Sequence, residues 1–150
     1  MPETPDTPNA PGAPGTARRG PEATASGPGR VLVAVYAIFA IGATSRAGVQ
    51  IATRFGEAPV PYLLSAFAAV VYVLATVALA RAGRRWWRVA VTACAFEMTG
   101  VLVVGATSLA LPGAFPDATV WSNFGMGYLF IPLVLPVLGL LWLRRTAPSR

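Results

Sequence analysis

The sequence predicts an all-α protein, a bundle of four transmembrane helices preceded by a disordered tail rich in proline and glycine. Three observations support this. Of 150 residues, 55% are hydrophobic and only 12% are charged, whereas soluble globular proteins have about 25% charged residues. The mean hydropathy is +0.58, although the first thirty residues contain no Val, Leu, Ile, Phe, Tyr or Trp. Four long apolar segments follow, which excludes a water-soluble enzyme.

The tail is predicted to span residues 1–30, where seven prolines and five glycines stand. Five of these prolines, at positions 2, 5, 8, 11 and 14, recur at every third residue, which is the period of a polyproline II helix. Without apolar side chains to bury, such a segment does not offset the entropy of ordering. We expect a solvated spacer; a ligand for an SH3-like domain is the alternative.

The apolar segments form one predicted transmembrane domain, residues 31–145, followed by a short tail of residues 146–150. A spanning helix needs about 20 apolar residues, and all four segments reach that length: 31–53, 61–80, 89–111 and 125–143. The first is interrupted by Ser45, Arg46 and Gln50. A cleaved signal peptide is the alternative there, but its thirty-residue leader is long for that class of segment.

The arginines predict the topology. All twelve basic residues are arginine, and ten of them fall on one side of the predicted membrane: positions 18, 19, 30, 81, 84, 85, 88, 144, 145 and 150. The positive-inside rule places that side, with both termini, in the cytoplasm of a multi-pass cell-membrane protein. The aromatic residues agree with this orientation. Trp86, Trp87 and Trp142 flank the basic clusters, and the outer interface is assigned to Tyr62, Trp121, Phe124 and Tyr128.

Composition also limits the chemistry. Histidine is absent and Cys94 is the single cysteine, so a histidine-ligated haem or zinc ion, a Ser-His-Asp triad and an intrachain disulfide are excluded. No nucleotide-binding or metal-ligand spacing occurs, and we expect no cofactor and no metal. The arginines flank apolar segments, which argues against nucleic acid as a partner. The expected partners are the lipid bilayer and either further copies of the chain or another membrane protein.

Two charges, Arg46 and Glu97, interrupt apolar segments. A charge at bilayer depth costs about 2.5 kcal/mol or more and normally faces a partner or a wet cavity. Helical phase places both on semi-polar faces, which predicts an intramembrane polar cluster of Arg46, Gln50, Tyr72, Glu97 and Ser108. Two alternatives remain open: Arg46 snorkels to lipid phosphates, and Glu97 is either a structural hydrogen-bonding group or a carrier of protons or cations.

Depth refines this prediction. At about 1.5 Å per residue, Glu97 and Tyr72 both lie about 12 Å from the cytoplasmic ends of their helices, and Arg46 lies about 22 Å from that side. Neighbouring antiparallel helices joined by a short loop usually pack together. We therefore predict that Glu97 bonds first to Tyr72 and only loosely to Arg46.

The prolines of the fourth segment, the single cysteine and the last outer loop have simpler structural interpretations. Pro132 and Pro136 predict a kink in the fourth helix, for which a static bend is favoured over a gate. Cys94 is expected to be a packing residue. The turn-rich loop from Gly113 to Phe124 holds Asp117, an acid with no arginine near it in sequence and a weak candidate for a binding residue.

Three segments carry a resemblance: A-T-S-R-A-G-V-Q-I-A-T-R-F-G-E-A-P at 43–59, P-Y-L-L-S-A-F-A-A-V-V-Y at 61–72, and F-G-M-G-Y-L-F-I-P-L-V-L-P-V-L-G-L-L-W-L-R-R at 124–145. Over residues 31–145 the chain resembles a family of small actinobacterial integral membrane proteins of unknown function. The resemblance implies a four-helix membrane protein and no activity.

The favoured function is therefore that of a non-enzymatic accessory or structural membrane subunit. The alternative is a small proton-coupled transporter that acts as a dimer and uses Glu97 as its membrane carboxylate. Small multidrug transporters have four short helices, but their essential carboxylate is in the first helix, so the likeness is one of size and charge pattern. A membrane enzyme is disfavoured because histidine and paired carboxylates are absent.

Overall fold

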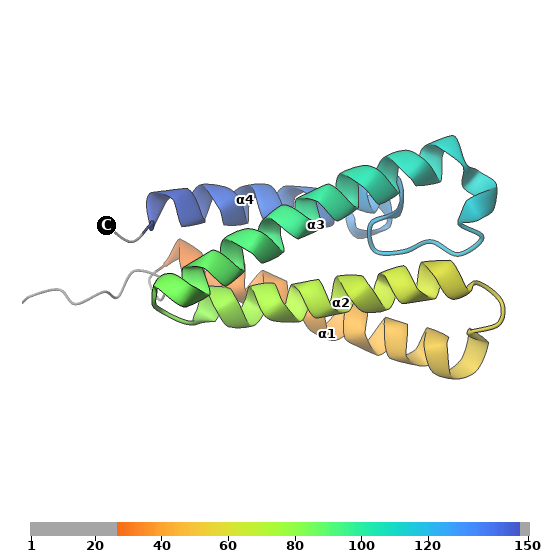
Figure 1. The fold of residues 1–150 in the computed structure, drawn as a ribbon, viewed down its shortest axis with the longest axis horizontal. Helices are drawn as coiled ribbons and strands as arrows, with labels where there is room; N and C mark the ends of the chain where they lie inside the picture. The colour runs from red at the N-terminus through yellow and green to blue at the C-terminus, as the bar shows by residue number, and fades with distance from the viewer. Residues whose placement is uncertain (1–26, 148–150) are drawn as a thin grey trace, which may run out of the picture.

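The computed structural model describes residues 27–147 and confirms the all-α bundle (Figure 1). Its elements are α1 (Pro28–Arg54), α2 (Pro59–Ala80), α3 (Arg84–Ala110), the short helices η1 (Pro112–Ala114) and η2 (Ser122–Tyr128), and α4 (Ile131–Arg145). The tail expected at 1–30 lies outside the described residues up to position 26, and Pro28 to Arg30 form the first turn of α1. The short tail expected at 146–150 is described only to residue 147.

Three helices are long and apolar enough to cross a membrane: α1, α2 and α3, with 27, 22 and 27 residues. Since a helix rises about 1.5 Å per residue, each exceeds the hydrocarbon thickness of about 30 Å. A fourth span exists if η2 and α4 are counted as one broken segment. Large apolar side chains cover the outside of the bundle, as at Ile38, 67% exposed, and Val103, 58% exposed. These are the features of a multi-pass helical membrane protein.

The helices pack in chain order. α1 packs most extensively on α2, α2 packs on α3, and α3 packs on α4, whereas α1 and α4 meet only slightly. Both helices of the α1–α2 pair bury small side chains, among them Ala40 and Ala43 on α1 and Ala68 and Ala75 on α2. Small residues let backbones approach closely, which is how helices associate where the surroundings are as apolar as the side chains.

The fourth span differs from the prediction of one kinked helix from residue 125 to 143. α4 begins at Ile131 and has 15 residues, so it is only about 22 Å long. It meets η2 at a bend of 99°. Leu129 and Phe130 between them have left-handed φ values of 56° and 58°, which end one helix and begin another. Pro132, near the start of α4, has no N–H to continue the preceding turn.

The segment before α4 fills the end of the bundle opposite the α2–α3 turn (Figure 1). We call residues 115–128 the inserted segment, because Thr119, Val120, Trp121 and Ser122 are all buried. Two glycines of α3 make room for it. A Cβ atom at Gly100 would lie 2.6 Å from the Trp121 ring, and one at Gly105 would lie 2.6 Å from the Phe124 ring. The Trp121 and Phe124 rings lie so close to the backbone of α3 that a side chain at either glycine would clash with them.

The inserted segment corrects the assignment of interfacial aromatics. Trp121 is 2% exposed and Tyr62 is 0% exposed, so neither forms part of an outer aromatic belt. Trp121 packs edge-on against Phe67, with ring centroids 6.4 Å apart, and Tyr62 donates a hydrogen bond to Asp117 at 2.5 Å. Both rings point inward because the loop folds back into the bundle.

Candidate functional site

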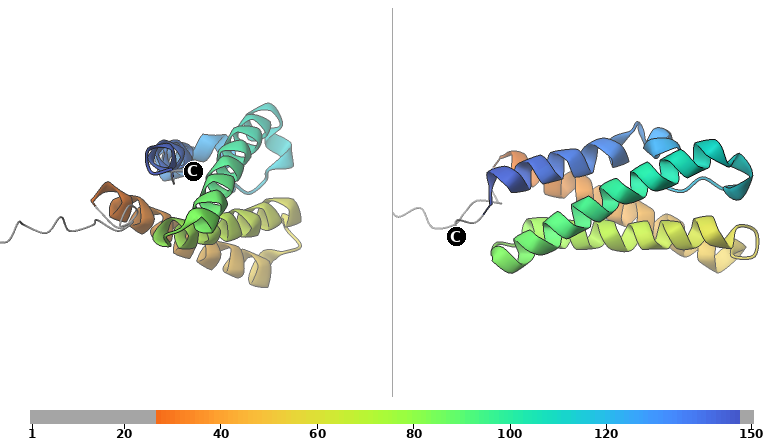
Figure 2. Two further views of the ribbon diagram at one scale, coloured as in Figure 1. Left: turned by 60° about the vertical axis from the view of Figure 1, so that its left-hand side comes forward. Right: turned by 45° about the horizontal axis from the view of Figure 1, so that its top comes forward.

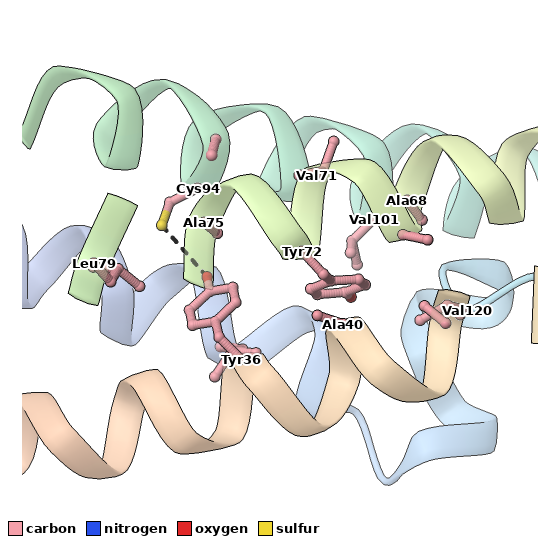
Figure 3. Packing of buried hydrophobic residues seen from close by; sticks show 14 of the residues in the cluster. Tyr36, Ala40, Ala68, Val71, Tyr72, Ala75, Leu79, Cys94, Val101 and Val120 are labelled. Carbon is pink, nitrogen blue, oxygen red and sulfur yellow. Dashed lines mark hydrogen bonds between the residues drawn. The ribbon is translucent and has the colours of Figure 1, made fainter. Parts of the chain in front are cut away.

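Glu97 lies at the centre of the bundle and is completely buried. Its Oε2 atom accepts a hydrogen bond of 2.8 Å from the hydroxyl of Tyr36 on α1. The Sγ atom of Cys94, about one turn earlier on α3, lies 3.4 Å from the same hydroxyl, as Figure 3 shows. Since the single proton of Tyr36 goes to Glu97, the thiol is the donor in the second contact. We call Tyr36, Cys94 and Glu97 the core site.

The bond from Tyr36 corrects the prediction that Glu97 bonds first to Tyr72. Tyr72 is equally buried, but its ring packs against Tyr36 and Phe39 at centroid distances of 6.2 and 5.8 Å. Its hydroxyl has no hydrogen-bond partner within residues 27–147. Tyr36 was not predicted, because the polar residues of the first helix were taken from the helical face of Arg46. At 3.6 residues per turn, Tyr36 lies about 80° around the helix from Arg46.

Three polar atoms around the core site have no partner within residues 27–147: Glu97 Oε1, Tyr72 Oη and Trp121 Nε1. Tyr72 neighbours both Glu97 and Trp121, so these atoms belong to one region of the interior. They are one acceptor, one N–H donor and one hydroxyl that can act as either. Unpaired polar atoms in a membrane interior are costly, which makes this region the least satisfied part of the described bundle.

α4 closes the core site from the remaining side. A Cβ atom at Gly139 would lie 2.9 Å from Cys94 Sγ and 3.3 Å from the Tyr36 hydroxyl oxygen. α1, α2, α3, α4 and the inserted segment therefore all contribute to the surroundings of Glu97. Figure 3 shows Tyr36, Tyr72 and Cys94 pointing into the same interior from three of these helices.

Arg46 lies elsewhere, at the end of the bundle that holds the inserted segment. Its Nη1 donates to the Tyr128 hydroxyl at 2.7 Å, and its Nη2 donates to the Ala118 carbonyl at 2.8 Å. Ser108 accepts a hydrogen bond of 2.8 Å from the Asn123 N–H. These residues, with Tyr62 and Asp117, form the loop-end cluster, which binds the inserted segment to the long helices.

The five residues predicted to form one polar cluster thus divide. Tyr72 and Glu97 are neighbours in the core, whereas Arg46 and Ser108 contact the inserted segment. Gln50 is half-buried, and its Oε1 atom has no partner in the described chain. The residues not predicted are Tyr36, Cys94 as a hydrogen-bonding group, and Trp121.

The chemistry available at the core site is limited to one carboxyl, one phenol and one thiol in contact. Across residues 27–147, no three His, Cys, Asp or Glu side chains gather closely enough to hold a metal ion. The arrangement can join α1 to α3 and can hold or release a proton at Glu97.

Comparisons with protein-family models, with curated proteins and with solved structures returned no match. The fold and the site define a class, a multi-pass helical membrane protein with a buried carboxyl-centred polar site.

Proposed function

We propose that this chain is a non-enzymatic membrane protein that acts as an accessory or structural subunit in the cell membrane. The enclosure of Glu97 is the observation that carries the proposal. Glu97 is 0% exposed and its hydrogen bond joins two helices. A cavity between α1 and α4 and another beside Ser108 and Asn123 both lie elsewhere, and Glu97 lines neither of them. A group in contact with substrate needs access to it, whereas a structural hydrogen bond does not.

We also propose that both termini are cytoplasmic. The start of α1, the α2–α3 turn and the end of α4 lie at one end of the bundle (Figure 1). Seven of the nine described arginines belong to these three places: Arg30, Arg81, Arg84, Arg85, Arg88, Arg144 and Arg145. We call this the arginine-rich end. The positive-inside rule supports its cytoplasmic placement. We also propose that the chain belongs to the family of small actinobacterial integral membrane proteins that it resembles.

The alternative is a dimeric proton-coupled transporter with Glu97 as its carboxylate. The unpaired atoms of Glu97, Tyr72 and Trp121 favour it specifically. A carboxyl with an unused acceptor can exchange partners as a bundle changes shape, and intramembrane acids commonly serve proton relays.

Proton flux separates the two functions. The purified chain is reconstituted into liposomes that hold a pH-sensitive dye, and a pH gradient is applied across the membrane. A structural subunit gives the same flux as empty liposomes. Flux that depends on the chain and is abolished by Glu97→Gln would establish the transporter and overturn our proposal.

Crosslinking provides a positive test of the subunit function. Single cysteines at membrane-facing positions, in a Cys94→Ala background, are crosslinked in native membranes. A subunit gives a discrete adduct from one face of the bundle, for example from Ile38 and not from Val103. A chain that acts alone gives no adduct from any face.

A cysteine placed at Glu57 or Asp117 should react with an impermeant maleimide added outside intact cells, and one at Arg84 should not. Reaction at position 84 in sealed cells would reverse the proposed topology.

A further inference from the structure

A groove of about 540 Å³ lies between α1 and α4. It exists because α1 packs mainly on α2 and α4 packs on α3, which leaves the first and last helices in slight contact. Figure 2 shows α1 and α4 close together at the arginine-rich end and diverging from there. The walls are apolar and include Val31, Leu32 and Val35 of α1 and Val134, Leu138 and Leu141 of α4.

The groove opens sideways, toward the bilayer. Val31 is 64% exposed, Val134 is 49% exposed and Leu138 is 50% exposed, so the side chains of both walls face outward. Lining residues run from Ile131 to Arg145 along the whole of α4, a length of about 22 Å. One leaflet of the hydrocarbon core is about 15 Å thick. The α4 wall is therefore long enough for the acyl chain of a lipid in one leaflet, and the α1 wall, from Pro28 to Val35, covers the part of the groove nearest Arg145.

One end of the groove is cationic. Arg145 lines it beside Trp142, and Arg144 and Arg30 are exposed at the same end of the bundle. No acid among residues 27–147 offsets them, because Glu57 and Asp117 belong to the opposite end and Glu97 is buried between the ends. Arginine is suited to phosphate recognition through its planar fork of donors.

We propose that this groove binds one anionic phospholipid, with an acyl chain along the walls of α1 and α4 and the phosphate at Arg145. Basic pockets between membrane helices are typical sites for anionic headgroups. The N-terminal residues 1–26 are a poor occupant because they contain none of the large apolar residues that the walls require. A second copy related by a twofold axis would bring its own arginines to the same end, where like charges repel.

The headgroup is tested with the purified full chain in a neutral detergent. Phosphatidylglycerol and phosphatidylcholine with identical chains are titrated, and binding is measured by native mass spectrometry and by the shift in thermal unfolding. We expect one phosphatidylglycerol per chain and little binding of phosphatidylcholine. Arg145→Gln should weaken binding about fivefold, because a basic residue near an anionic lipid contributes about 1 kcal/mol.

Arg88→Gln is the matched charge control. Arg88 is exposed at the same end, on α3, and does not line the groove. Its substitution should change the affinity less than twofold. Equal weakening by both substitutions would show a diffuse attraction to basic surface and would overturn the site.

The acyl chain is tested by filling the groove. Leu138→Trp should abolish phosphatidylglycerol binding, whereas Leu102→Trp, at a comparably exposed position on α3, should not. Glycerol phosphate, which has the charge without the acyl chains, should neither bind nor shift the thermal unfolding of the protein. If glycerol phosphate raises the temperature of thermal unfolding, the groove is a simple anion site and the proposal is overturned. If Leu138→Trp dissociates a dimer instead of removing a lipid, the occupant is a second copy of the chain and the proposal is again overturned.

Discussion

The core site and the loop-end cluster each contain one of the two charges that interrupt the apolar segments. Glu97 is completely buried, has one partner and leaves one oxygen unpaired. Arg46 is half-buried, and both terminal nitrogens donate hydrogen bonds. The first site joins two regular helices, and the second joins a helix to irregular backbone.

The difference shows where partners for buried charges come from. A regular helix uses its own carbonyls, so the core site depends on side chains alone. The inserted segment is not a regular helix around residue 118, and the Ala118 carbonyl is free to accept from Arg46. Irregular backbone is tolerated at membrane depth when protein covers it. The irregular backbone before α4 therefore supplies a free carbonyl acceptor for Arg46, which a continuous helix would not.

The largest expected effect concerns the contact that seats the inserted segment above the core site. Gly100→Ala should lower the free energy of unfolding by about 3 kcal/mol, the upper end of overpacking costs, because the new Cβ would lie 2.6 Å from the Trp121 ring. Thermal or steric-trap unfolding in detergent measures this. Gly42→Ala, with nothing within 4 Å of its Cβ, is the control and should not destabilise. Equal stability of the two variants would contradict the position of Trp121.

The core site should be the more sensitive of the two polar sites. Glu97→Leu leaves the buried Tyr36 hydroxyl without an acceptor and should cost about 2 kcal/mol. Glu97→Gln should cost less than half of that, because its amide oxygen can still accept from Tyr36. The same unfolding measurement applies. If leucine is tolerated as well as glutamine, the hydrogen bond does not hold α1 to α3.

The loop-end cluster should respond locally. Arg46→Gln should lower the free energy of unfolding by about 1 kcal/mol, because at this half-buried site water replaces part of the hydrogen bonding that Arg46 provides. Hydrogen exchange should accelerate in residues 115–128 and not around Glu97. Arg54→Gln, at an exposed position on the same helix, is the control. Faster exchange at the core would mean that the two sites are coupled and not separate.

The smallest effect separates the two core tyrosines. Tyr36→Phe removes the bond to Glu97 and should cost about 0.6 kcal/mol, typical of hydrogen bonds between membrane helices. Tyr72→Phe removes a hydroxyl that has no partner in the described chain and should be neutral or slightly stabilising. The reverse order would restore Tyr72 as the donor to Glu97.

Part of the core site was within reach of sequence reasoning. The length of its apolar segment predicted α3, and the charge inside that segment identified Glu97. The depth estimate correctly predicted that Tyr72 is a neighbour of Glu97. The donor was missed because Tyr36 lies about 80° around α1 from Arg46, off the semi-polar face that helical phase identified. Arg46 was correctly separated in depth from Glu97, but its partners lie in a loop whose path has no periodic signal.

The sequence by itself determined the all-α class, the long apolar helices and the charge at one end, because these follow from local composition and segment length. Only the tertiary structure decided the break at Leu129 and Phe130, the bond from Tyr36 to Glu97 and the burial of Trp121. Helical phase assigns a residue to a face, but the neighbour that meets this face depends on how the helices rotate and tilt. In this bundle, glycines at positions 100, 105 and 139 allow the close approaches that set those contacts.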